Sequence, residues 1–398
     1  TAWILTSTAL VLFMTLPGLA LFYCGLVNSK NVVSVLMQHF ALACVVSIIW
    51  VTIGYSLAFS TGNAWIGDLS NLFMKSITLD SISGTIPESL FASFQMTFAI
   101  ITPALIIGAF VERIKFSAML IFLSLWVIIV YLPVTHWVWG GGLLSSWGVM
   151  DFAGGIVVHA TAGTAALVTA LTLGKRRGFP KSITPPHSPI LTMIGAAMLW
   201  VGWFGFNAGS ALGANSSAGM AMLVTHISAA TAALVWMFIE WKRFGKPSLI
   251  GVVTGMVAGL ATVTPASGYI GIPGGLILGF LGGLLCYLAV DYIRGKLQID
   301  DSLDVFAVHG VGGILGSLLV AFLATSTFLG LGLPEGQTAS SQFIIQFKGV
   351  ALTICWTAVF TYLILKLTSF IVPLRVEEEE EIEGLDLRSH GEKGYHSD

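Results

Sequence analysis

The sequence predicts an all-α integral membrane protein with eleven transmembrane helices. Of its 398 residues, 56% are hydrophobic and only 10% are charged, and the mean hydropathy is +0.89. A spanning helix needs about 20 apolar residues, and eleven runs of this kind follow one another along the chain. Short strands of alternating polarity, which a membrane β-barrel needs, do not occur in the sequence. This composition argues against a water-soluble globular protein.

The eleven runs are separated by short polar connections. They cover residues 6–27, 33–59, 89–111, 117–134, 151–173, 190–209, 217–240, 249–268, 272–293, 305–326 and 343–371. Since no connection exceeds about 30 residues, we expect one membrane domain, residues 1–373, followed by a tail, residues 374–398.

The basic residues predict the orientation, because short loops rich in Lys and Arg stay cytoplasmic. The most basic connections are "GKRRGFPK" (174–181) and "EWKRFGKP" (240–247), after the fifth and seventh runs. Only Lys75 and Lys348 fall on the opposite side. We therefore expect a multi-pass protein of the cell (inner) membrane with its N-terminus outside and its C-terminus in the cytoplasm. The net charge of −2 gives no indication of a nucleic-acid partner.

The cysteines and the motif content exclude several functions. Cys24, Cys44, Cys286 and Cys355 all fall within apolar runs and lack metal-ligand spacing, so we expect small buried hydrophobic residues. The sequence contains no HExxH, GxSxG, P-loop or CxxC motif. We therefore expect no enzyme activity and no cofactor.

A weak internal repeat relates two halves of the chain. "VVHATAGTAAL" (157–167) in the fifth run resembles "AVHGVGGILGS" (307–317) in the tenth, and "GLALFYCG" (18–25) resembles "GWFGFNAG" (202–209). Because a repeat of five helices is odd in number, helices 1–5 and 6–10 must have opposite orientations. This predicts an inverted five-helix repeat plus helix 11, with a substrate path near the membrane midplane.

His159 and His309 occupy matching places in the two repeats. An imidazole in hydrocarbon is costly unless its nitrogens find partners, and such residues usually face a bundle interior or a pathway. Two imidazoles that meet at the repeat axis can share one proton between their Nδ1 atoms and leave an Nε2 at each end. The alternatives are two separately satisfied core histidines or a metal site. The metal site is disfavoured because no Asp, Glu or Cys lies near either histidine at ligand spacing.

Acidic residues stand at the start of both histidine runs. Asp151 opens the fifth run, where it either caps the helix or attracts a cation from an outer vestibule. Asp300, Asp301 and Asp304 stand directly before the tenth run, at the start of its helix, and we expect the same capping role for all three.

Four aromatic residues are expected in the outer half of the membrane. Trp139 lies in a glycine-rich turn, Phe98 in the third run, and Trp203 and Phe206 in the sixth. A ring face attracts a small cation, by about 2 kcal/mol or more where water is excluded. Tryptophan is also common at membrane interfaces, so residue type alone does not single out Trp139.

Several ordered motifs carry a resemblance to a known family. They are "LPGLALFYCGLVNSKN" (16–31), "ERIKFS" (112–117), "WVWGGGLLSSWGVMDFAGGIVVH" (137–159), "WFGFNAGS" (203–210), "TPASGYIG" (264–271) and "DVFAVHGVGGILG" (304–316). These segments resemble the ammonium transporter (Amt/Mep/Rh) family, on its bacterial Amt side. The resemblance continues into the tail with "GLDLRSHGEKGY" (384–395).

The resemblance implies a homotrimer in which each subunit has its own hydrophobic pore for ammonia. By motif matching, ammonium binds outside at Trp139, Ser210 and Phe98; Phe98 and Phe206 form a gate; His159 and His309 are the twin histidines of the pore; and Asp151, Trp203, Asn207 and Thr264 support the site. Ammonium would lose a proton before the gate, because an intact ion is costly in an apolar lumen.

The tail bears on two hypotheses for the function, an ammonium transporter and an ammonium sensor. A glutamate run such as that in "RVEEEEEIEGLDLRSHGEKGY" (375–395) is typical of a solvated helix start or a linker. In the family, however, this tail controls activity, and related proteins bind a PII-type signalling protein there. A minority continue into a signalling domain and act as ammonium sensors. A metal or proton transporter is a weaker third hypothesis.

Three residues of the chain, Cys24, Asn28 and Leu303, depart from the family pattern.

Overall fold

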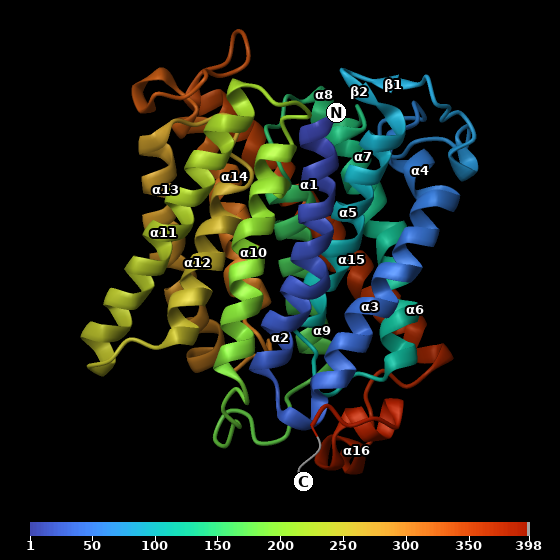
Figure 1. Ribbon diagram of the computed structural model, residues 1–398, viewed down its shortest axis with the longest axis vertical. Helices are drawn as coiled ribbons and strands as arrows, with labels where there is room; N and C mark the ends of the chain where they lie inside the picture. Colours follow the sequence, from blue (N-terminus) through green and yellow to red (C-terminus); the bar gives the residue numbers. More distant parts are fainter. Residues whose placement is uncertain (396–398) are drawn as a thin grey trace.

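The computed structural model describes residues 1–395 as a bundle of helices that run roughly along one long axis (Figure 1). The α-helices are α1 (Ala2–Phe13), α2 (Ala20–Leu26), α3 (Val32–Ile49), α4 (Tyr55–Phe59), α5 (Glu88–Ile107), α6 (Phe116–Trp126), α7 (Leu132–Trp139), α8 (Leu143–Ser146), α9 (Thr161–Leu173), α10 (Pro189–Gly209), α11 (Ser216–Phe244), α12 (Leu249–Val263), α13 (Ile272–Val290), α14 (Val311–Leu323), α15 (Ala339–Ile371) and α16 (Glu378–Glu383). A hairpin of β1 (Ile82–Ser83) and β2 (Ile86–Pro87) lies in the longest connection.

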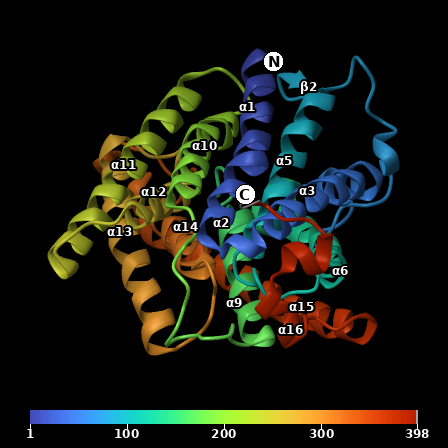
Figure 2. The same ribbon diagram turned by 60° about the horizontal axis from the view of Figure 1, so that its bottom comes forward.

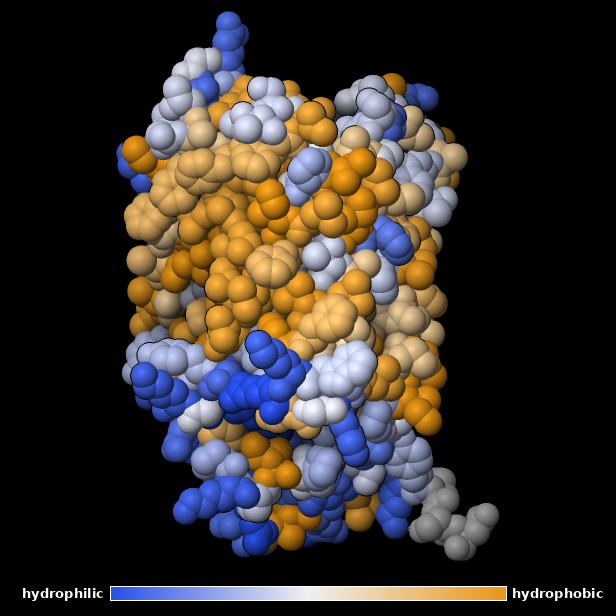
Figure 3. Space-filling model, turned by 90° about the vertical axis from the view of Figure 1, so that its left-hand side faces the viewer, coloured by the Kyte–Doolittle hydropathy of each residue, from blue (hydrophilic) through white to orange (hydrophobic). Residues whose placement is uncertain are grey.

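The helices match the expected membrane architecture. Within residues 1–395, ten helical runs are long and apolar enough to cross a bilayer, and α12 is a shorter apolar helix of 15 residues. Figure 3 shows a broad hydrophobic band around the middle of one face, with hydrophilic residues toward both ends. The all-α membrane fold is thus confirmed. The number eleven stays a prediction, since α12 is too short to count by length alone.

Seven turns of the described helices are wound as π-helix rather than α-helix. They are η1 (Met14–Leu19), η3 (Trp50–Gly54), η5 (Val127–Tyr131), η6 (Gly155–Ala160), η7 (Asp291–Lys296), η8 (Phe306–Gly310) and η10 (Asp386–His390). Turns of this type are rare and occur often at functional sites. Of the seven, η6 carries His159 and η8 carries His309.

The two histidine-bearing helices cross at glycines. A Cβ atom at Gly163 would lie 2.3 Å from the Cα of Gly310, and one at Gly313 would lie 2.6 Å from the Cβ of His159. Gly163 and Gly313 each follow their histidine by four residues. The absence of side chains therefore lets the two backbones approach closely enough for the imidazoles to meet.

The prediction that all four cysteines are buried is wrong for two of them. Cys24 and Cys286 are buried, whereas Cys44 and Cys355 are exposed on the outside of the bundle. Both exposed cysteines belong to helices long enough to span the membrane, α3 and α15. Lipid accepts a small, weakly polar thiol as readily as the core does, so an apolar sequence context did not distinguish the two environments.

The tail folds back on the end of the bundle at which α3 begins (Figure 2). Lys30 Nζ donates to the carbonyl oxygens of Glu381, at 3.1 Å, and Ile382. The Asp386 carboxylate accepts the backbone N–H of Ser34 at 2.8 Å, which caps the first turn of α3. The glutamate run is thus a short docked helix, α16. Residues 396–398 of the predicted tail lie outside the described residues.

Candidate functional site

His159 and His309 meet in the interior of the bundle. Their Nδ1 atoms are 3.2 Å apart, and their rings stack with centroids 5.2 Å apart and planes 19° apart. Both side chains are buried. They come from η6 and η8, the two π-helical turns that precede the glycine crossing.

The hydrogen bond between the two Nδ1 atoms determines whether each Nε2 is a hydrogen-bond donor or an acceptor. A neutral imidazole has one N–H, so an Nδ1 to Nδ1 hydrogen bond requires one ring to donate and the other to accept. The donating ring then has a lone pair on Nε2, and the accepting ring has an N–H on Nε2. Within residues 1–395, Nε2 of His159 has no hydrogen-bond partner. The pair therefore offers one acceptor and one donor to a small molecule that reaches it.

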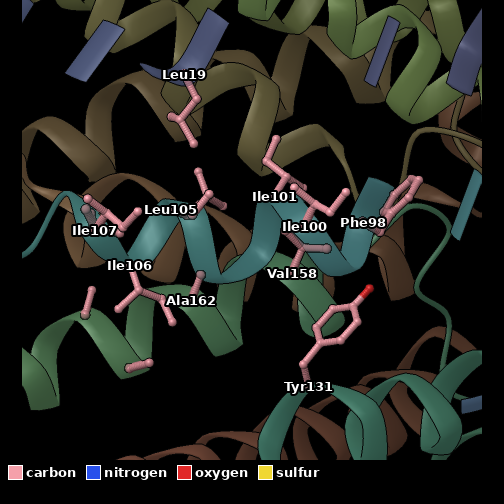
Figure 4. Close-up of a cluster of buried hydrophobic side chains, with 14 of the residues drawn as sticks. Leu19, Phe98, Ile100, Ile101, Leu105, Ile106, Ile107, Tyr131, Val158 and Ala162 are labelled. Carbon is pink, nitrogen blue, oxygen red and sulfur yellow. The ribbon is translucent and has the colours of Figure 1, made fainter. Parts of the chain in front are cut away.

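A small apolar cavity surrounds the pair. Its volume is about 10 Å³, and it is lined by His159, His309 and ten apolar side chains, among them Leu19, Ile101 and Val158. Figure 4 shows these three among the buried aliphatic side chains between α5 and its neighbours. A space of this size accommodates about one water-sized molecule. The cavity therefore suits a neutral molecule with one heavy atom and gives no compensation to an ion.

A column of aromatic rings closes the outer side of this cavity. Phe206 stacks on His159 with ring centroids 6.0 Å apart, and Phe98 lies 4.3 Å from Phe206. Trp139 meets Phe98 edge to face at 5.7 Å and 88°. Trp139 is partly exposed, while both phenylalanines are buried. The structure thus brings the two predicted gate residues, Phe98 and Phe206, into direct ring contact.

Trp203 holds His159 from a second side. Its indole stacks on the imidazole with centroids 5.3 Å apart and planes 17° apart. Its Nε1 donates to Thr264 Oγ1 at 2.9 Å, so the buried indole is both fixed and satisfied. Thr264 and Trp203, expected as supporting residues, therefore act on the orientation of His159.

Ser210 and Asn207 lie at the outer end of α10. Ser210 is partly exposed, and its Oγ donates to the Phe206 carbonyl at 2.8 Å. Asn207 is buried, and its Nδ2 donates to Thr225 Oγ1 at 2.9 Å. Ser210 therefore has a hydroxyl oxygen near the gate, whereas Asn207 ties α10 to α11. No motif in the sequence had indicated Thr225.

Asp151 caps the turn that carries His159. Its Oδ1 accepts the N–H groups of Gly154 and Gly155, and its Oδ2 accepts those of Ile156 and Val157, all at 2.7 to 3.1 Å. Its carbonyl also accepts Trp139 Nε1 at 2.9 Å. The buried carboxylate is thus directed at backbone amides, which supports the capping alternative.

The three acidic residues before the tenth run divide into two roles. Asp301 caps the histidine turn, because its Oδ2 accepts the Phe306 N–H at 2.7 Å. Asp300 instead pairs with Arg176 at 2.9 Å, and Asp304 pairs with Arg294 at 3.7 Å. The expectation that all three cap is therefore wrong for Asp300 and Asp304. Arg176 lies 124 residues from Asp300 in the sequence and also hydrogen-bonds it, whereas Arg294 lies only ten residues before Asp304.

Sequence reasoning missed the specific match between Asp301 and Asp151. Each precedes its histidine by eight residues, and each accepts the backbone N–H five residues further on. Three residues after each aspartate, Gly154 and Asp304 have positive φ angles of 113° and 57°. The equal spacing was the signal that could have found Asp301.

On its inner side, His309 also lines a cavity of about 540 Å³. Asp304, Arg176 and Arg294 line the same cavity, which lies at the end of the bundle that the basic loops predict to be cytoplasmic. Burial raises the pKa of Asp304 to about 7, against the opposing effect of Arg294. His309 therefore lies between the small apolar cavity and a polar vestibule.

Within residues 1–395, no group of three or more His, Cys, Asp or Glu side chains is arranged to hold a metal ion.

The chain matches the Ammonium Transporter Family over residues 2–395. The chain belongs to this family. An ammonium transporter of Aquifex aeolicus (strain VF5) is 47% identical over 99% of this chain and 93% of its own.

Solved structures of family members share the fold. A protein named "Sensor Amt Protein" matches with a TM-score of 0.91 and 29% identity over 98% of this chain and 97% of its own. Candida albicans Mep2 matches with a TM-score of 0.87 and 36% identity over 95% of this chain and 86% of its own. The expected family and the multi-pass membrane class are confirmed, and the family is one of transporters rather than enzymes.

Proposed function

We propose that the protein transports ammonium across the cell membrane through a pore centred on His159 and His309. The observation that supports this most is the buried histidine pair at the inner end of a closed aromatic column, in a cavity that fits a molecule the size of ammonia. Relatives across the whole length of the chain are named ammonium transporters.

Ammonium would bind first at the outer rim. Trp139 offers a ring face, and its indole is fixed by the Asp151 carbonyl. Ser210 Oγ offers an acceptor, because its own proton is donated to the Phe206 carbonyl. Phe98 forms the floor of this position. Together they replace part of the water shell of a cation that donates hydrogen bonds.

The ion would then lose a proton at the gate. Ammonium in an apolar cavity of about 10 Å³ has no compensation for its charge, whereas ammonia fits and is neutral. One N–H bond of ammonium breaks, its electron pair stays on nitrogen, and the proton is taken up by a water molecule at the outer rim. Ammonia then passes His309 into the inner vestibule.

The remaining assignments follow the same proposal. The N-terminus lies outside and the tail in the cytoplasm, in agreement with the basic loops 174–181 and 240–247. Residues 1–373 form the membrane domain, and residues 374–398 a regulatory tail that docks on the inner face. A homotrimer and a PII-type partner at that face are proposed from the family resemblance.

A sensor is the second candidate, because one neighbour of this fold is named as a sensor. The test is ammonium-induced current and uptake in liposomes that contain the purified protein. The proposal predicts saturable ammonium flux that His159→Ala or His309→Ala changes, and no flux in empty liposomes. Ammonium binding without flux would contradict transport and favour the sensor.

A further inference from the structure

Gln346 on α15 forms an unusually complete set of hydrogen bonds at the outer rim. Its Oε1 accepts the Met150 N–H at 2.7 Å, and its Nε2 donates to the Met150 carbonyl at 2.8 Å. The second Nε2 proton goes to the Ser317 carbonyl at 2.7 Å, and Gln342 Nε2 donates to Oε1 at 3.1 Å. The side chain is fully buried. Every donor of this amide is therefore used, and its oxygen accepts twice.

The position of these bonds matters more than their number. Met150 directly precedes Asp151, whose carbonyl fixes the Trp139 indole. Ser317 lies on α14, eight residues after His309. Gln346 therefore joins the segment that holds the outer ring to the helix that carries a pore histidine.

Gln342 extends the contact by one turn of α15. Its Nε2 also donates to the Gly148 carbonyl at 2.9 Å, so two glutamines on one helix face hold the backbone of residues 148–150. The turn that follows is closed internally by the four bonds to the Asp151 carboxylate. The glutamines therefore fix the backbone that enters this turn, while the Phe152 N–H bond to the Pro265 carbonyl at 3.0 Å holds its next residue.

We propose that Gln346 is a positioning residue for the outer ammonium site, acting through Met150 and Asp151 on Trp139. The inference rests on the proposed function of that site. Loss of the amide leaves the Met150 N–H and carbonyl without partners, so the segment must shift to satisfy them. A shift of a binding group by about 1 Å is enough to weaken recognition substantially. The Phe98–Phe206 ring contact and the histidine pair do not involve these groups.

The test is the concentration dependence of ammonium uptake in liposomes, with direct calorimetric titration of ammonium on the same preparations. Gln346→Met keeps the length and burial and removes the amide. We expect its half-saturating concentration and its dissociation constant to rise about tenfold, equivalent to about 1.4 kcal/mol, with a maximal rate within about twofold of wild type. Gln38→Met removes an equally buried glutamine amide on α3 and should change neither.

A fall in maximal rate alone, or unchanged half-saturation and binding, would overturn the inference. If Gln346→Met does not fold, Gln342→Met removes only two of the bonds and is expected to weaken both quantities about threefold; no change there would overturn it equally. Wild-type protein that binds ammonium without flux would contradict the proposed transport, and the titration would still decide the role of Gln346.

Discussion

Two histidine segments share one backbone plan: residues 151–163, which we propose start on the outer side, and residues 301–313, which we propose start on the inner side. Each begins with a capping aspartate, has a left-handed residue three positions on, a histidine eight positions on in a π-helical turn, and a crossing glycine twelve positions on. The pairs are Asp151 with Asp301, Gly154 with Asp304, His159 with His309 and Gly163 with Gly313. This plan places two imidazoles face to face.

The same plan carries different side-chain chemistry at its two ends. Outside, the Asp151 carboxylate is occupied by four backbone amides. Inside, Oδ1 of Asp301 has no partner among the described residues, and Asp304 replaces a glycine and pairs with Arg294. The outer end leads to a closed aromatic column, and the inner end to an open vestibule. The shared backbone thus brings the two histidines together, and the side chains make the two ends chemically different.

The largest effect is expected from a substitution of the capping aspartate Asp151. Asp151→Asn leaves one acceptor oxygen and turns an NH₂ group toward backbone N–H donors, at about 1 to 3 kcal/mol for each unsatisfied group. We expect ammonium flux in liposomes to fall by about 100-fold and the melting temperature to drop. Asp68→Asn, in the exposed outer loop, serves as the control. Near-normal flux in Asp151→Asn would contradict the proposed importance of the Asp151 cap.

The glycine crossing tests whether both halves contribute equally to the pair. Alanine at Gly163 or Gly313 forces the helices apart, which costs about 1 to 3 kcal/mol, and we expect either change to lower flux at least about tenfold. Gly219→Ala on α11 meets nothing within 4 Å and should be neutral. A strong effect at only one of the two crossing glycines would show that the halves are not equivalent.

The Asp304 side chain tests the difference between the halves by pH. Because burial raises its folded pKa to about 7, above about 4 in the unfolded chain, the protonated acid stabilises the fold fully below pH 4. That stabilisation is lost as the pH rises through 7. We expect an infrared carboxylic-acid band that disappears between about pH 6 and 8 and is missing in Asp304→Asn.

The matched control for this measurement is Asp291→Asn, at an exposed ion pair with Arg243. It should leave the band and its pH dependence unchanged. A band that persists in Asp304→Asn would assign the proton to another group and remove this difference between the two segments.

The smallest effect is expected for Asp301→Asn. The substitution keeps one acceptor oxygen for the Phe306 N–H, and the free Oδ1 loses no bond. We expect flux within about threefold of wild type and a loss of stability of about 1 kcal/mol, measured by thermal unfolding. An effect as large as that of Asp151→Asn would mean that the two caps are equivalent after all.

Much of the site was visible in the sequence because it depends on local patterns. The matching Val-His segments predicted that His159 and His309 correspond, and apolar run lengths predicted the helices. Asp151 was expected as a cap because an aspartate after a glycine-rich turn has that preference. These features depend on neighbours along the chain, which a sequence displays directly.

The remainder depends on contacts between distant segments. Asp300 was expected to cap because its partner Arg176, 124 residues away, is identified only by packing. Arg294 is only ten residues from Asp304, but their pairing depends on how the chain turns between them. Gln346 was overlooked inside an apolar run, although a glutamine in a spanning helix is itself a signal of internal hydrogen bonding. The burial of Cys286 and the exposure of Cys355 likewise depend on which helix face meets lipid.

The central claim is that the two segments meet in one histidine unit that carries ammonium transport. The most direct test compares ammonium flux in liposomes for wild type, His159→Ala, His309→Ala and the double variant. The account predicts that each single change alters flux at least about tenfold, and that the double variant differs little from the singles because the rings act together. Single effects that multiply in the double variant, or flux equal to wild type in all three, would contradict it.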